Sequence, residues 1–161
     1  LGATICTPRS PACGICPWRE PCAGRAAGIA AGLPARAAKA PKPVRHGWVY
    51  VAQDAGGRVL TVTRPDRGLL GGMRALPSSD WAPILPDPGP PMPAAWQAAG
   101  EVRHTFTHFH LVLRVMAARV TGFAGAPGLP VAAPEAARAM PTVFAKALRL
   151  GLGGAGVANG A

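Results

Sequence analysis

The 161-residue chain carries 17 Lys and Arg residues against 7 Asp and Glu residues, a formal net charge of +10 and a sequence pI near 11.0. Its length allows one domain with its own core and short appendages, and its charge favours polyanions such as nucleic acid, although an alanine- and arginine-rich coding bias would give the same balance. No apolar run approaches the roughly 18 residues of a membrane span and no leader is apparent before the cysteines, so we expect a cytoplasmic protein outside the membrane.

The four cysteines of the chain all lie within its first 22 residues, at Cys6, Cys13, Cys16 and Cys22. The spacing C-x6-C-x2-C-x5-C lets four thiolates converge on one inorganic centre, either an iron–sulfur cluster or tetrahedral zinc. Structural zinc sites usually pair two C-x2-C knuckles, whereas this chain has one, and disulfides usually spread through a whole small domain. The residues therefore favour an iron–sulfur cluster over zinc, and zinc over disulfides.

Residues 25–45 are rich in Ala, Pro, Lys and Arg and have no apolar periodicity. We expect a basic linker here, which either follows phosphates or is simply solvated. The composition then changes: residues 48–53 are rich in β-formers, residues 54–57 predict a turn, and residues 58–63 predict a second strand. A β-hairpin is therefore expected after the linker.

Residues 65–93 are heavy in Pro, Gly, Asp and Ser and predict long loops. We expect the elements that follow to be a short helix, two strands and two helices, at residues 94–100, 102–106, 109–120, 135–140 and 142–150. The Gly- and Ala-rich stretch from Gly151 predicts a disordered tail. Strands mixed with short helices predict an α/β domain of about a hundred residues.

The cysteine spacing resembles the cluster loop of the endonuclease III and adenine DNA glycosylase superfamily. Residues 64–73 (RPDRGLLGGM, with Leu-Pro three residues later) and residues 104–111 (HTFTHFHL) resemble the adenine glycosylases of the MutY type. The closing segment 141–148 (PTVFAKAL) agrees with them, so the resemblance covers nearly the whole chain.

This resemblance implies a small loop at residues 1–24 in which Cys6, Cys13, Cys16 and Cys22 hold a [4Fe–4S] cluster. It implies that the linker 25–45 leads to a Nudix-like (MutT-like) mixed-sheet domain at residues 46–150, followed by the tail 151–161. The family's enzymes act in base-excision repair and remove adenine opposite 8-oxoguanine or guanine in double-stranded DNA. The resemblance therefore implies a monomer in a bacterial cytoplasm, associated with the DNA.

The family's catalytic carboxylates lie in a helical domain that precedes the cysteines, so we assign no catalytic residue to this chain. It begins without Met, in what reads as mid-helix, and we expect it to be the C-terminal portion of such an enzyme. The alternative is a module that stands alone and binds nucleic acid through a metal cluster without catalysis. A Nudix hydrolase is disfavoured, because Mg²⁺ binding needs several carboxylates on one helix and no two glutamates of this chain are close together.

The family contacts 8-oxoguanine through a Phe-Ser-His loop, with which Phe106, Thr107 and His108 align. Thr107 keeps the serine hydroxyl, while an apolar side chain such as Phe106 can stack on a base and His108 can donate a hydrogen bond. Without the resemblance, the alternation of histidine and aromatic residues from His104 to His110 favours ordinary packing on a strand face. A zinc site made by His104, His108 and His110 is the least favoured interpretation.

The cluster loop also carries three arginines. If the cluster fixes the loop, Arg9, Arg19 and Arg25 would be placed against phosphates, which positions DNA without reading its sequence. The alternative is that the cluster is a purely structural staple.

Overall fold

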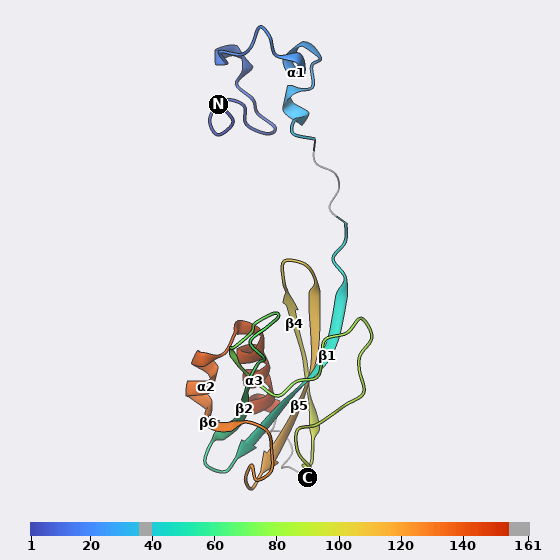
Figure 1. Ribbon diagram of the computed structural model, residues 1–161, viewed down its shortest axis with the longest axis vertical. Coiled ribbons are helices and arrows are strands. Elements are labelled where there is room, and N and C mark those ends of the chain that lie inside the picture. The colour runs from blue at the N-terminus through green and yellow to red at the C-terminus, as the bar shows by residue number, and fades with distance from the viewer. Residues whose placement is uncertain (36–39, 155–161) are drawn as a thin grey trace. The chain divides into compact units, whose positions relative to one another are not determined.

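The computed structural model describes residues 1–35 and 40–154, which form two compact units, Leu1–Pro41 and Lys42–Ala161 (Figure 1). The first unit contains only short helical turns: the 3-10 helix η1 (Cys13–Ile15), the helix α1 (Ala23–Ala26) and the 3-10 helix η2 (Ala30–Gly32). None of its described residues is fully buried. A unit of this size without a hydrophobic core needs another source of stability, for which bound metal is a common solution in small domains.

The second unit is built on a mixed β-sheet. Its strands are β1 (Val44–Asp54), β2 (Arg58–Thr63), β3 (Arg74–Ala75), β4 (Gln97–Thr105), β5 (His110–Val120) and β6 (Leu129–Ala132). The strand order is β3-β2-β1-β5-β4, with β6 paired to β2. β1 and β5 run parallel along all 11 residues of each strand, and the other pairs are antiparallel.

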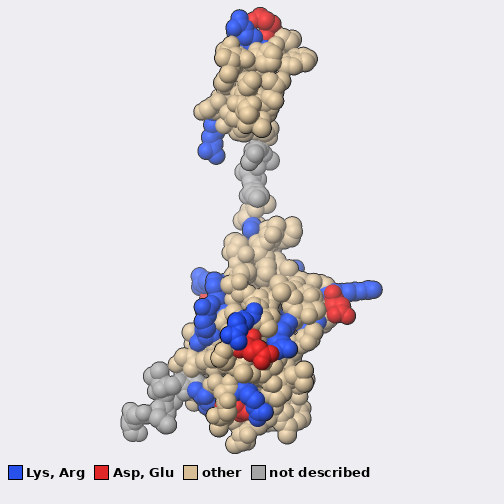
Figure 2. Space-filling view, turned by 90° about the vertical axis from the view of Figure 1, so that its left-hand side faces the viewer, with Lys and Arg blue, Asp and Glu red and all other residues tan. Residues whose placement is uncertain are grey.

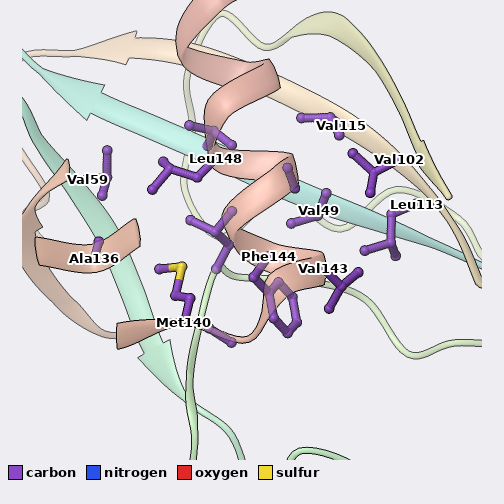
Figure 3. Packing of buried hydrophobic residues seen from close by; sticks show 14 of the residues in the cluster. Val49, Val59, Val102, Leu113, Val115, Ala136, Met140, Val143, Phe144 and Leu148 are labelled. Atoms are coloured by element: carbon purple, nitrogen blue, oxygen red, sulfur yellow. The ribbon is translucent and has the colours of Figure 1, made fainter. Parts of the chain in front are cut away.

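Two helices, α2 (Ala133–Ala139) and α3 (Thr142–Gly154), close the chain. α3 packs on β4, β5 and β1, and Phe144 and Leu148 project from it toward sheet residues such as Val49 and Val115 (Figure 3). All four of these side chains are fully buried. None of the helices in the described part of the chain is long and apolar enough to cross a membrane.

The α/β class expected from the sequence is confirmed, and β2 coincides with the predicted strand at residues 58–63. β1 begins at Val44, two residues before the predicted start of the domain. Residues 65–93, all within the described part of the chain, contain no helix and a single strand, the two-residue β3, in agreement with the predicted loop. β3 and β6 were not predicted, because such short strands are specified by the partners they pair with rather than by local periodicity.

The predicted helix at residues 94–100 is wrong, because β4 begins at Gln97 and pairs with β5. The register shifts between Ala98 and Gly100, and Gly100 has φ +132°, a backbone angle that favours glycine. Backbone pairing along β5 therefore outweighs the weak local helix propensity of the Ala-Ala-Trp-Gln-Ala-Ala stretch.

The last helix is longer than predicted. α3 runs to Gly154 rather than ending at Leu150, and Gly151 is buried against β1, where Val51 leaves no space for a side chain. Tertiary contact thus keeps a glycine-containing turn helical. The rest of the predicted tail, residues 155–161, lies outside the described residues, as does part of the predicted linker, residues 36–39.

Candidate functional site

The four cysteines line one small cavity of about 30 Å³, together with Arg19 and Arg25. The cysteines lie at the ends of the short turns: Cys13 opens η1, Cys16 follows it, and Cys22 precedes α1. Their thiols are all free, so the disulfide interpretation finds no support in the structure. Turns of three or four residues thus bring together sulfurs that are up to 16 positions apart in the sequence.

The donor chemistry of this cavity fits an iron–sulfur group, since four unbridged thiols around a shared space are the ligand set of such clusters. Among the described residues, no three His, Cys, Asp or Glu side chains are grouped closely enough to hold one metal ion. A zinc ion with bonds of about 2.3 Å would need its sulfurs at about 4 Å from one another. The structure thus brings four unbridged thiols to one cavity, and the metal group that they hold stays a prediction.

The three arginines of this unit differ in position. Arg19 donates from Nε to Glu20 Oε1 at 2.9 Å, and Arg25 donates from Nη1 to the Arg19 carbonyl oxygen at 3.2 Å. Both line the cysteine cavity, whereas Arg9, with φ +73°, lines a separate recess with Pro8 and Leu33. The structure thus brings Arg19 and Arg25 to the cysteines but not Arg9, and contact of all three with phosphate stays a prediction.

In the second unit, Phe106, Thr107 and His108 lie in the turn between β4 and β5. The Phe106 N–H donates to the Phe109 carbonyl oxygen at 2.9 Å, and Lys42 Nζ donates to the Phe106 carbonyl oxygen at 2.8 Å. Thr107 and His108 are exposed, whereas Phe106 is half-buried. The turn thus exposes a hydroxyl and an imidazole to solvent, and two hydrogen bonds of the Phe106 backbone fix its conformation.

The Phe106 ring belongs to an aromatic cluster. Its centroid lies 4.6 Å from that of His104, 5.0 Å from that of Phe109 and 5.9 Å from that of Trp81, which is stacked on it. Phe106 therefore packs within the domain, while Thr107 and His108 face solvent, and contact of all three with a lesion stays a prediction.

The histidines near this turn are not gathered. His104 shares a row of the sheet with the buried Leu111, whereas His110 shares the next row with the exposed Thr105, so the two histidines lie on opposite faces. His110 Nδ1 is 2.9 Å from Thr105 Oγ1. Burial, and secondarily the charge of Lys146, lowers the pKa of His104 below its ordinary value. The structure gives the zinc interpretation no support, because His104 and His110 lie on opposite faces of the sheet.

Beside the turn lies a recess of about 590 Å³ that the sequence did not reveal. Arg64 Cζ is 4.8 Å from the centroid of the Trp81 ring, and Arg45 Cζ is 4.8 Å from that of Phe109. Trp81 reaches β1 because Gly47 has no side chain; a Cβ there would lie 2.8 Å from Trp81 Cδ1. Trp81 lies in a loop without periodic pattern, so the sequence does not indicate which residues it contacts. The one local signal is Gly47, since a glycine within a strand can mark a close approach of another segment.

Two family models match different parts of this chain. The NUDIX domain profile matches residues 47–150, and the profile of the iron–sulfur binding domain of endonuclease III matches residues 6–22. Among curated proteins, the adenine DNA glycosylase of Homo sapiens is 26% identical over 178 residues, which cover 76% of this chain and 33% of the human protein. The chain therefore spans about a third of the length of that relative.

Two solved structures show the same fold as the second unit. The C-terminal domain of mouse MUTYH, solved in complex with human PCNA, has a TM-score of 0.50 and 26% identity, covering 66% of this chain and 86% of that one. The MutT protein of Methanosarcina mazei Go1 has a TM-score of 0.51 over 69% of this chain and 94% of that one, but its 14% identity supports the fold alone. The expected mixed-sheet fold with an N-terminal cysteine motif is thereby confirmed.

Proposed function

This chain belongs to the NUDIX domain family, and from that premise we propose that it is the C-terminal portion of an adenine DNA glycosylase, in which it supplies the iron–sulfur loop and the lesion-reading domain. The observation that carries the proposal is the combination of a four-thiol cavity with a Nudix fold in one chain. The similarity to the human adenine DNA glycosylase, which covers 76% of this chain, supports the same proposal. Excision of adenine opposite 8-oxoguanine or guanine is proposed for the longer protein.

The cluster proposed for the first unit is [4Fe–4S], held by Cys6, Cys13, Cys16 and Cys22. Bound there, it would supply rigidity to a unit in which none of the described residues, 1–35, 40 and 41, is fully buried. Arg19 and Arg25 line the same cavity, so their positive charges would offset the negative charge of the thiolates. Fixed by the cluster, these arginines and Arg9 would then meet phosphates of the duplex.

In the second unit, the proposed reader of 8-oxoguanine is the turn that contains Phe106, Thr107 and His108. The exposed hydroxyl of Thr107 can donate and accept a hydrogen bond, and the His108 ring can donate one to the base or to a phosphate. Phe106 supports the turn from the aromatic cluster and offers an apolar edge to an unstacked base. The net charge of +10 supports association with double-stranded DNA before the lesion is read.

The proposal is tested by binding of the full chain to fluorescent duplexes that contain 8-oxoguanine·A, G·A or G·C pairs. We expect wild-type protein to prefer 8-oxoguanine·A, and Thr107→Val or His108→Ala to reduce that preference roughly threefold to tenfold, the value of one hydrogen bond. Thr107→Ser retains the hydroxyl and serves as the matched control, with the preference unchanged. Equal preference in wild type and both variants would refute the assignment of this turn.

A further inference from the structure

The function proposed above gives no role to the recess beside the β4–β5 turn. It adjoins the turn, because Phe106 contacts Trp81 and Phe109, which both line it. Its other lining groups include Arg45, Arg64 and the hydroxyl-bearing Thr63 and Ser78. Arginines, hydroxyls and aromatic rings together are typical of a site for an anion.

Arg64 is held in place by its neighbours. Its guanidinium packs on the Trp81 ring and lies 5.9 Å from the centroid of Phe144, while its Nε donates to the Leu69 carbonyl oxygen at 3.2 Å. Among the described residues, its two Nη groups make no hydrogen bond and no ion pair. The face of the guanidinium is thus covered, while its outer edge remains free to donate.

Burial of this charge has an energetic consequence. Arg64 is half-buried, and burial lowers its pKa, an effect that the negative charge of Asp80 partly opposes. A desolvated guanidinium without an ion pair costs free energy, and an anionic ligand would recover part of that cost.

Arg45 supplies a second guanidinium, which also stacks on a ring but is exposed. It extends from β1 over the face of the buried Phe109, and within the described residues it too has no ion pair. Two guanidiniums that are stacked on fixed rings lose less side-chain freedom when they bind a ligand than two free side chains would.

The charge of the recess indicates the charge of the ligand. Two arginines and one carboxylate, Asp80, line it, which leaves a formal charge of +1. A phosphodiester carries a single negative charge and presents oxygens that match the donor edge of a guanidinium. The chain as a whole carries a net charge of +10, and Figure 2 shows Lys and Arg side chains interspersed with Asp and Glu on the face that it displays, so a polyanion would be attracted to the protein.

We propose that this recess binds a phosphate group of a nucleotide, with Arg64 as the principal ligand and Arg45 as the second. The preferred source is a phosphodiester of the damaged strand, because the recess is contiguous with the turn proposed to read the lesion; in that respect the inference rests on the proposed function. A free nucleoside monophosphate is the other source of the same chemistry.

The test is the salt dependence of duplex binding by the full chain. Each phosphate contact contributes about 0.9 to the slope of log affinity against log salt concentration. We expect Arg64→Met and Arg45→Met each to lower that slope by about 0.9 and to weaken binding roughly tenfold. Arg119→Met is the matched control: it removes the same charge at the far end of β5, where Arg119 bonds Gln53, and leaves the slope unchanged.

A titration with dGMP distinguishes the two sources, followed through the indole N–H resonance of Trp81. If wild-type protein binds dGMP, and Arg64→Met abolishes this binding but leaves the salt slope of duplex binding unchanged, the recess recognises the phosphate of a free nucleotide. Unchanged slopes in both arginine variants, with no dGMP binding that depends on Arg64, would overturn the inference.

The two proposals can fail separately. A chain that prefers 8-oxoguanine·A while its arginine variants keep the wild-type slope retains the proposed function and loses the phosphate site. A chain without lesion preference whose arginine variants lose about 0.9 of slope retains the phosphate site and loses the lesion-reading function.

Discussion

His104 and His110 stand six positions apart on paired strands, yet their surroundings are opposite in character. His110 is exposed and hydrogen-bonded to Thr105, whereas His104 is half-buried with its ring edge against Phe106. Since adjacent rows of a strand point to opposite faces, the alternating sequence cannot by itself say which histidine faces the core. Exposure separates the residues of the turn: Phe106 is half-buried among aromatic rings, whereas Thr107 and His108 are exposed.

The surroundings of His104 predict its titration. Burial and the charge of Lys146 lower its pKa in the folded state, while the unfolded chain keeps the ordinary value of about 6.5. Between these two pKa values the unfolded state binds more protons, so this contribution to stability is full above about pH 6.5 and declines as the pH falls toward the folded pKa. NMR titration of the ring should place His104 below 6.5, and Lys146→Gln should raise its pKa. A pKa at or above the ordinary value would contradict this account.

At the scale of elements, the longer strands β2 and β5 were predictable from the sequence, and the start of β4 was not. Leu111, Leu113 and Val115 are fully buried and alternate with exposed residues such as His110 and Arg114, a pattern of period two that sequence displays directly. The stretch 94–100 has no such pattern, and its conformation depends on the hydrogen bonds that β5 offers to β4. Local helix propensity has little influence where a neighbouring strand offers hydrogen-bond partners to the backbone.

The C-terminal end of α3 provides a test of tertiary contact against propensity. Replacing a helical glycine by alanine ordinarily stabilises by about 0.5–1 kcal/mol. At Gly151, however, the new Cβ would lie 2.6 Å from Val51 Cγ2 and 2.7 Å from Val51 Cβ, in a fully buried part of β1. Overpacking of this kind costs about 1–3 kcal/mol, so we expect Gly151→Ala to lower the free energy of unfolding by about 1 kcal/mol or more.

Gly153 is the matched control for that substitution. It lies in the same helix, and no atom is within 4 Å of the position its Cβ would take. Gly153→Ala should therefore leave the free energy of unfolding unchanged or raise it by up to about 1 kcal/mol. Urea denaturation of both variants measures the difference, and a stabilising Gly151→Ala would show that β1 and α3 are not packed as described.

At the scale of the whole molecule, the two units depend on different forces. The unit Lys42–Ala161 has a core in which Phe144, Leu148 and the sheet residues exclude water, whereas the described part of Leu1–Pro41 has no fully buried residue. The first unit therefore needs another source of stability, and the cluster proposed for its four thiols would supply it.

Loss of the cluster should accordingly affect only one unit. In Cys13→Ser we expect loss of iron and of visible absorbance, together with loss of the ordered amide resonances of residues 1–35. The unfolding free energy of the second unit should change by less than about 0.5 kcal/mol, because the substitution lies outside its core. Cys13 and Cys16 should behave alike. Stoichiometric zinc in the wild-type chain, or an unchanged absorption spectrum in the variant, would exclude the iron–sulfur assignment.

The sequence by itself determined what short-range spacing encodes. Four cysteines within 17 consecutive positions indicate a shared thiolate centre, and apolar alternation indicates the strands on either side of the turn at Phe106, Thr107 and His108. Only the tertiary structure decided which turn residues are packed, where α3 ends, and that Arg45, Arg64 and Trp81 line one recess. Arg45 lies in β1, Arg64 follows β2 and Trp81 lies in the long loop. They meet because strands far apart in the chain pair in one sheet, and a local sequence pattern does not contain that information.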